Sequence, residues 1–302
     1  MKLQPSTVTP PSYLLIKGAL TICSWLPLPV LHGLGWFWGT MLAHIPNRAR
    51  NTTRRNLETC FPNQDKTEIL ALTRESLIHT ACTALEMGIA WIAPIEKTLG
   101  LIISNEGYDK YRADVDGDRG VILLAPHLSN WEVFGFFASE GVAANFMYQP
   151  PRSHGLDRLL RQARSRNGVK MAPTNKRGVA QLLAALKNGE MVGILPDQVP
   201  ADESGVFANF FEEPALTMTL VSKLVQRTGA KVYCGYARRL RRGEGFCAVF
   251  READPAIYSS NLEESVQGLN NSVENAVLEA VSQYQWEYKR FRRRPDNSEF
   301  YS

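Results

Sequence analysis

The segment Val121-Ile-Leu-Leu-Ala125 is followed, after one proline, by His127-Leu-Ser-Asn-Trp-Glu132. The apolar run is typical of a buried strand, and the aromatic stretch 131–137 favours a helix directly after it. The histidine and the glutamate are therefore predicted at a strand-to-helix turn, where α/β enzymes commonly bind their ligands. A neutral imidazole can remove a proton from a hydroxyl, and a carboxylate close by can orient the ring. The segment predicts an α/β fold with a histidine base at one edge of its sheet.

The spacing of His127 and Glu132 excludes one class of enzyme and restricts the geometry. Zinc proteases place two histidines one helical turn apart, with a glutamate beside the first, whereas this segment holds one histidine. Side chains five positions apart on a helix point about 140° away from each other. His127 is therefore expected in the turn and Glu132 in the first helical turn. A purely structural pair, in which the glutamate only complements the helix dipole, is the alternative interpretation.

Apolar runs alternate with helical patterns along the rest of the chain, which indicates βαβ units. We predict a mixed, mostly parallel central sheet flanked by helices, with no domain break after residue 50. Strands are predicted near 121–125, 143–148, 169–171, 191–195, 231–237 and 246–251. Helices are predicted at 66–91 (capped by Asp65 or Thr67), 130–140, 156–166, 177–188, about 216–228 and 262–288, with a loop after Pro196.

Two further polar positions belong to the same predicted sheet edge as His127. Asp197 and Gln198 come just past the predicted strand 191–195, and carboxyl ends of parallel strands meet at one edge. Asn130 lies inside the motif turn itself. We interpret these three residues as substrate-binding candidates, with ordinary loop packing as the alternative.

Arginines recur at every third position of the predicted helix 156–166. Arg158, Arg161 and Arg164 share a broad helical face, from which guanidinium groups could bind phosphate bidentately. They predict a phosphorylated substrate or carrier. A solvated helix face would give the same pattern.

The first fifty residues differ in composition from the rest of the chain. Between Tyr13 and Ile45 the only Lys, Arg, Asp or Glu is Lys17, and prolines divide the stretch into pieces shorter than the ~20 residues that span a bilayer. Four arginines follow within 48–55 and favour the cytoplasmic side of a membrane. We predict a membrane-anchoring segment at residues 1–50 and a catalytic domain at residues 51–302. A kinked span, a re-entrant hairpin, two interfacial helices and a buried hairpin of a soluble protein are the open forms of this segment.

The composition of the whole chain is that of a folded protein. The 302 residues are 44% hydrophobic and 21% charged, with a net charge of +4. Five cysteines without metal-ligand spacing indicate reduced thiols in a cytosol-facing domain. No cofactor or metal site is predicted, since no glycine-rich phosphate loop follows a strand. Basic residues at 238–242 and 290–294 suit an acidic carrier or anionic lipid, and the apolar N-terminus favours a membrane over nucleic acid as partner.

The chain resembles the late-step lipid A biosynthesis acyltransferases (lauroyl and myristoyl acyltransferases) of the lysophospholipid acyltransferase superfamily. The resemblance covers most of the length and rests on segments in a fixed order. They are the apolar N-terminus, Asn56-Leu-Glu-Thr-Cys-Phe-Pro62, Ala125-Pro-His-Leu-Ser-Asn-Trp-Glu132, Tyr148, Arg164-Ser-Arg-Asn-Gly168, Leu195-Pro-Asp-Gln198, Phe210-Phe211 with Pro214-Ala215, and Gln285-Trp-Glu-Tyr-Lys-Arg-Phe291.

This resemblance implies a glycerol-3-phosphate-acyltransferase-like fold at the cytoplasmic face of an inner membrane. It implies transfer of a fatty acyl chain from acyl carrier protein to a hydroxyl of a Kdo-bearing lipid A precursor. His127 would be the general base and Glu132 its orienting partner, while Asp197 and Arg164 match a family acid and arginine. The residues Ser-Asn-Trp-Glu within the motif differ from those of other members, so the identity of the acceptor is left open.

Chemistry and pattern leave three alternatives to this function. A thioester donor is already activated, so a base and oxyanion donors suffice, and the backbone N–H groups at the helix start after His127 could supply the latter. The same dyad could act on a glycerophosphate acceptor or on water, as a lysophospholipid acyltransferase or a hydrolase. A non-catalytic membrane-binding protein is the third alternative.

Overall fold

The computed structural model describes residues 11–150 and 154–301. Within these residues, the largest sheet has seven strands in the order β1-β9-β8-β2-β5-β3-β4. Their bounds are β1 Ile102–Glu106, β2 Val121–Leu124, β3 Ala144–Tyr148, β4 Lys170–Pro173, β5 Met191–Ile194, β8 Lys231–Arg239 and β9 Phe246–Glu252. Strands β8, β2, β5, β3 and β4 run parallel, whereas β9 is antiparallel to β8 and parallel to β1. The predicted mixed, mostly parallel sheet is confirmed.

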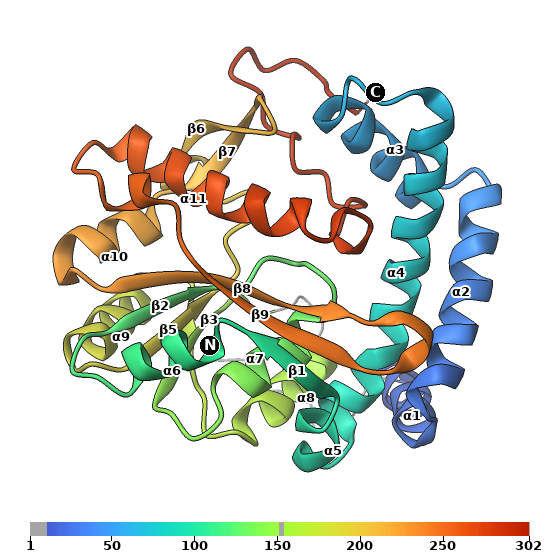
Figure 1. Cartoon of the computed structure of the whole chain (residues 1–302), viewed down its shortest axis with the longest axis horizontal. Helices are drawn as coiled ribbons and strands as arrows, with labels where there is room; N and C mark the ends of the chain where they lie inside the picture. Colours follow the sequence, from blue (N-terminus) through green and yellow to red (C-terminus); the bar gives the residue numbers. More distant parts are fainter. Residues whose placement is uncertain (1–10, 151–153, 302) are drawn as a thin grey trace, which may run out of the picture.

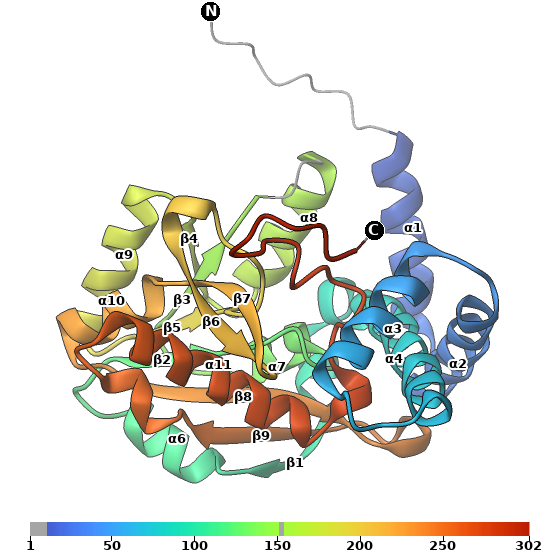
Figure 2. The same ribbon diagram turned by 90° about the horizontal axis from the view of Figure 1, so that it is seen from above.

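Helices cover both faces of this sheet, and a group of N-terminal helices lies against one end of it (Figures 1 and 2). The N-terminal group comprises α1 Pro11–Trp25, α2 Leu28–His44, α3 Arg48–Cys60 and α4 Lys66–Ile92. The others are α5 Ile95–Leu99, α6 Tyr108–Val115, α7 Trp131–Ala138, α8 His154–Ser165, α9 Lys176–Lys187, α10 Leu220–Thr228 and α11 Leu262–Leu278.

Strand β2 shows why the sheet is covered on both sides. Its Ile122 and Leu124 join a core cluster with α9, α10 and α11, while Val121 and Leu123 join a second cluster with α6 and α7. All four side chains are buried, as expected for a central strand whose successive side chains point to opposite faces. The continuous apolar run that predicted this strand thus reflects helices on both faces.

The long helix α4 confirms the prediction at 66–91 and supports the apolar N-terminus. Asp65 caps it in a capping box with Glu68. Helix α2 packs closely on α4 because it presents Gly35 and Gly39 there. A Cβ at Gly35 would lie 2.5 Å from the sulfur of Cys82, so only glycine permits this approach.

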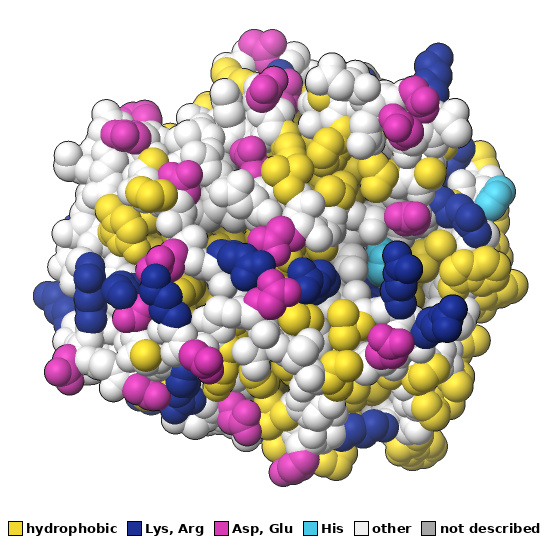
Figure 3. Space-filling view, viewed as in Figure 1, with side chains coloured by type: hydrophobic (Ala, Val, Ile, Leu, Met, Phe, Trp, Pro, Cys, Tyr) yellow, Lys and Arg dark blue, Asp and Glu magenta, His cyan; other side chains and the backbone are white. Residues whose placement is uncertain are grey.

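Helices α1 and α2 separate at Pro27, as the prolines predicted, and leave an apolar face in solvent. In residues 11–150 and 154–301, none of the helices combines the length and apolarity required to cross a bilayer. The exposed apolar side chains on α1, α2 and just beyond are Leu14, Leu15, Ile16, Ile22, Trp25, Val30, Leu34, Trp36, Phe37, Trp38, Met41 and Ile45. We call this set the apolar flank. Figure 3 shows hydrophobic side chains gathered at the edge of the molecule where α2 lies.

Two sequence predictions were wrong. The region after Pro196 holds a hairpin of β6 (Gly205–Phe210) and β7 (Glu213–Met218), so α10 begins at Leu220 rather than near 216. The final helix ends at Leu278 instead of Tyr288. The segment beyond it holds a short 3-10 helix, Val281–Gln283, after which Tyr284 forms a bridge with Leu128 of the motif turn.

Candidate active site

Strands β2 and β5 bring His127 and Asp197 together. The two strands are paired in parallel register, with Leu124 opposite Ile194, so the residues that follow them emerge side by side. The Nδ1 atom of His127 lies 2.9 Å from Oδ1 of Asp197, and the backbone N–H of His127 donates to Oδ2 at 2.8 Å. One carboxylate therefore fixes both the ring and the backbone of the histidine.

The charge of Asp197 is maintained by this arrangement. Burial alone would raise the pKa of the carboxyl, but the adjacent His127 ring and the hydrogen bonds from its ring and backbone lower that pKa. An ionised Asp197 accepts a hydrogen bond from the protonated Nδ1 of His127. Nε2 is then the nitrogen that can take up a proton. The side-chain amide of Gln198 lies 3.2 Å from Nε2 and donates to it in this tautomer.

The structure corrects the role expected for Glu132. We predicted that Glu132 would orient the His127 ring, but Asp197 holds that position. The carboxylate of Glu132 instead accepts from Nε and an Nη of Arg164 at 3.1 and 2.5 Å. Only 5% of the Glu132 side chain and 14% of the Arg164 side chain are exposed, so the pair is largely desolvated.

The predicted arginine cluster is not a single phosphate clamp. Arg164 is turned inward to Glu132, whereas Arg161 pairs with Asp157 on its own helix and its guanidinium lies over the Tyr148 ring. Arg158 is exposed. The structure therefore separates Arg164 from the other two.

The turn between His127 and α7 is held by backbone bonds. Ser129 has a φ of 56°, a left-handed conformation that few residues other than glycine adopt. Its N–H donates to the carbonyl of Gln283 at 2.8 Å, and the N–H of Gln285 donates to the carbonyl of His127 at 3.0 Å. The C-terminal segment thus keeps the motif turn in an otherwise unfavourable conformation.

A buried charged cluster supports the turn from behind. Asn130 caps α7 by accepting from Val133 and donates to Glu86 of α4 at 3.0 Å. Glu86 is fully buried and also binds Arg239 through Nε and Nη2, each at 2.7 Å, and Nε2 of His32 at 2.7 Å. Burial would raise the pKa of Glu86, but Arg239 and His32 lower it to about 2. We call these four residues the Glu86 cluster.

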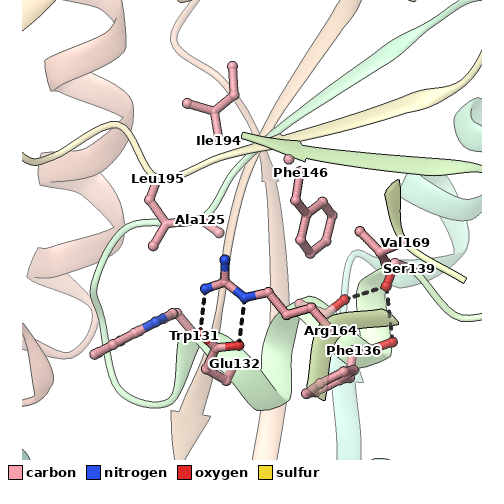
Figure 4. A pocket seen from close by; sticks show the side chains of 12 residues that line it. Ala125, Trp131, Glu132, Phe136, Ser139, Phe146, Arg164, Val169, Ile194 and Leu195 are labelled. Atoms are coloured by element: carbon pink, nitrogen blue, oxygen red, sulfur yellow. Dashed lines mark hydrogen bonds and ion pairs between the residues drawn. The ribbon is translucent and has the colours of Figure 1, made fainter. Parts of the chain in front are cut away.

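An apolar pocket opens beside the Glu132–Arg164 pair (Figure 4). Phe146 of β3 points into it, and a Cβ at Gly193 would lie 2.5 Å from the Phe146 ring, so glycine makes room for the aromatic side chain. The other apolar lining residues include Ala125, Trp131, Phe136, Val169, Ile194 and Leu195. Trp131 also contacts the His127 ring edge-on, with centroids 4.8 Å apart.

The start of α7 offers hydrogen-bond donors near the histidine, as the sequence predicted. The N–H groups of His127, Leu128, Ser129 and Val133 are bonded within the protein. Those of Trp131 and Glu132 have no protein acceptor within the described ranges. Such paired N–H groups can stabilise an oxyanion. In the same ranges, no group of three or more His, Cys, Asp or Glu side chains is placed to bind a metal ion.

Comparison with known proteins identifies the family. The sequence profile described as "Bacterial lipid A biosynthesis acyltransferase" matches residues 1–293. The chain belongs to this family. It is therefore an acyltransferase of lipid A biosynthesis, and the resemblance inferred from the motifs is confirmed.

Named relatives of this acyltransferase differ in the acyl chain that their names give. A lipid A biosynthesis lauroyltransferase of Escherichia coli K12 is 26% identical over 92% of this chain and 90% of its own length. A lipid A biosynthesis palmitoleoyltransferase of the same strain is 26% identical over the same shares. A lipid A biosynthesis acyltransferase of Haemophilus influenzae is 25% identical over 90% of this chain and 87% of its own.

Sequence reasoning missed some residues around the site of this acyltransferase. Glu86 lies within α4 and Arg239 is the last residue of β8, and nothing in their local pattern shows that they meet. Arg239 was counted with the basic residues 238–242, but its side chain is buried against Glu86. Phe146 was assigned only to a strand, although the glycine at 193 of the neighbouring strand is a signal of close approach.

Proposed function

We propose that this acyltransferase moves a fatty acyl chain from acyl carrier protein to a hydroxyl of a Kdo-linked lipid A precursor, with His127 as general base. The observation that carries the proposal is the Asp197–His127 pair with Trp131 beside it, because Trp131 also lines the apolar pocket. A base fixed next to an apolar pocket suits a reaction that joins an acyl chain to a hydroxyl.

The proposed step needs no covalent enzyme intermediate. Nε2 of His127 removes the proton of the acceptor hydroxyl, after Gln198 has been displaced, while the acceptor oxygen attacks the thioester carbonyl. The N–H groups of Trp131 and Glu132 stabilise the tetrahedral oxyanion. Cleavage of the C–S bond releases the thiolate of the carrier, which takes the proton back from the imidazolium. Asp197 stays ionised throughout and stabilises the imidazolium.

Glu132 acts in this proposal through Arg164. The carboxylate occupies Nε and one Nη of the guanidinium and so fixes its orientation in the lining of the apolar pocket (Figure 4). The fatty acyl chain of the donor enters that pocket, with Phe146 across its depth. The fixed cation then lies where the polar thioester end of the chain enters.

The apolar flank is proposed to attach residues 1–50 to the cytoplasmic face of the inner membrane, with residues 51–302 as the catalytic domain. Tryptophans and basic residues are enriched where proteins meet a bilayer surface. Arg241 and Arg242 are exposed in the β8–β9 turn, next to the start of α2 at Pro29. They would meet anionic lipid headgroups or the acidic carrier protein.

The first experiment offers purified enzyme in detergent a series of acyl carrier proteins loaded with saturated chains from decanoyl to palmitoyl. The acceptor is a tetra-acylated Kdo-linked precursor, and products are weighed by mass spectrometry. We expect the mass of the lipid to rise by one acyl group or two, and this gain to disappear in His127→Ala. Release of free fatty acid without lipid acylation would favour a hydrolase. Equal turnover by a folded His127→Ala protein would refute the general base.

Membrane attachment is tested separately with phosphatidylglycerol-containing vesicles. The double variant Trp36→Ser, Trp38→Ser should bind these vesicles several-fold more weakly, because both side chains are about half exposed on the apolar flank. Tyr258→Ser removes a comparably exposed aromatic side chain from another part of the surface and serves as the control. Equal binding of all three proteins would refute attachment through this flank.

A further inference from the structure

A second pocket, lined by more polar groups than the apolar pocket, lies against His127 on the side of α4. It lies between α4, the motif turn and the C-terminal segment 283–287, and has a cavity volume of about 230 Å³. Ala84, Met87 and Trp131 form its apolar part, and the polar part is described below. We call it the α4 pocket.

Polar groups of the α4 pocket are buried but not fully used by the protein. The hydroxyl of Ser129 and the side-chain carbonyl of Gln285 have no hydrogen-bond partner in the described part of the chain. Ser129 is only 1% exposed. Buried polar atoms without partners are rare in native proteins and call for a ligand or another explanation. Ser129 is also held by backbone bonds in its left-handed conformation, so the hydroxyl is fixed at this wall.

Glu287 adds a carboxyl group to the same wall. Its Oε2 accepts from the hydroxyl of Thr80 at 3.0 Å. Burial raises the pKa of Glu287, although Thr80 and the nearby His127 act in the opposite direction. The lining contains no Lys or Arg among the residues that the structure describes. A wall of hydroxyl, amide and carboxyl groups without a cation is suited to neutral hydroxyls and amides and is unsuited to phosphate.

We infer that the α4 pocket is the acceptor subsite, and that Ser129, Gln285 and Glu287 bind the neutral hydroxyl- and amide-bearing part of the lipid acceptor. This inference rests on the proposed function and specifies which side of His127 each substrate occupies. The donor chain lies in the apolar pocket, the acceptor lies in the α4 pocket, and Trp131 lines both. The pocket is lined by α4, the helix on which α1 and α2 pack, so it adjoins the support of the apolar flank.

Steady-state kinetics separate the two substrates. Ser129→Ala and Glu287→Ala should each raise the KM for the tetra-acylated precursor on the order of tenfold, the change expected from one lost hydrogen bond in a buried site. The KM for acyl carrier protein should remain unchanged. Glu75→Ala removes an exposed glutamate from the same helix α4 and is the matched control. A rise in the donor KM, or an unchanged acceptor KM in both variants, would overturn the inference.

A labelling experiment tests the subsite without turnover. Ala84→Cys places a thiol at an exposed position of the pocket, and Ala71→Cys places one at an exposed position elsewhere on α4. The precursor should slow maleimide labelling of the Ala84→Cys protein but not of the Ala71→Cys protein. Phosphatidylglycerol at the same concentration, and acyl carrier protein, should slow neither.

The outcomes distinguish the subsite from the proposed function. Protection of Ala84→Cys by the precursor in an enzyme that transfers no acyl group would keep the subsite and reject the reaction. Transfer to the precursor without protection, or equal protection by phosphatidylglycerol, would reject the subsite and keep the reaction.

Discussion

Replacing Glu86 by glutamine should destabilise the protein far more than the loss of one charge on its surface would. The carboxylate receives Nε and Nη2 of Arg239, each at 2.7 Å, and both side chains are at most 2% exposed. In either orientation, the NH₂ group of a glutamine would face a guanidinium N–H. Arg239 would then be a buried charge without a counterion, which costs about 3–5 kcal/mol.

This amount is a large part of the 5–15 kcal/mol that holds a typical domain folded. In a protein of this size it corresponds to a fall in the thermal midpoint of roughly 5–8 °C. The assay is thermal unfolding of wild type and Glu86→Gln in the same detergent, followed by circular dichroism. When the NH₂ group of the glutamine takes the place of Oε2, Asn130 also loses the acceptor of its side-chain amide, so acyl transfer should weaken at temperatures where the variant is still folded.

Two companion variants make the result specific. Glu58→Gln breaks the exposed Arg54–Glu58 pair and should change the stability by less than about 1 kcal/mol. Glu86→Met combined with Arg239→Met removes both charges and should recover much of the loss, since no unpaired charge is left buried. A midpoint for Glu86→Gln equal to that of Glu58→Gln would refute the reasoning, and so would a double variant less stable than Glu86→Gln.

Three other predictions concern the catalytic pair, the acyl pocket and acid stability. Asp197→Asn should lower kcat by a factor of about 10²–10⁴ with little change in either KM, because the His127 ring loses its tautomer and the countercharge of its imidazolium; a kcat within twofold of wild type would contradict the assigned partner. Phe146→Ala should shift the preferred donor toward longer chains in a competition between acyl carrier proteins, since the Phe146 ring points into the apolar pocket; an unchanged preference would place the chain elsewhere. Folding lowers the pKa of Glu86 from an ordinary 4.5 to about 2 and also lowers the pKa of Asp197. The stabilising contributions of both carboxylates are therefore complete above about pH 4.5 and are lost as the pH drops toward 2. Urea unfolding midpoints that rise between pH 5 and pH 3 would contradict this sign.

The central strands and the sheet edge that carries the site were predictable because their signals are local. The apolar run before His127 and the run before Asp197 each end at a polar loop, and parallel strands bring such ends to one edge. Which carboxylate meets which cation was not predictable in this way. It depends on β2 and β5 being neighbours and on the left-handed turn at Ser129, which directs Glu132 away from the imidazole and toward α8.

The errors at 205–218 and 279–288 have separate physical causes. The β6–β7 hairpin turns at Phe211 and Glu212, which have positive φ values of 49° and 65°, and neither is a residue that signals such a turn. Beyond Leu278, the chain forms a short 3-10 helix, Val281–Gln283, and then turns that bury Tyr284 and Trp286. The helical pattern of the preceding residues led to the prediction that the helix continues to Tyr288.

The contact between His32 and Glu86 has a consequence for protein engineering. His32 belongs to α2, so a shortened chain designed for solubility that lacks α1 and α2 would remove a partner from the fully buried carboxylate of Glu86 and uncover the face of α4 around Cys82. Such a truncation would alter the environment behind the motif turn as well as the surface. Solubility is better sought by replacing individual exposed side chains such as Trp36 and Phe37 with polar ones, which keeps the backbone of α2 and the His32–Glu86 contact in place.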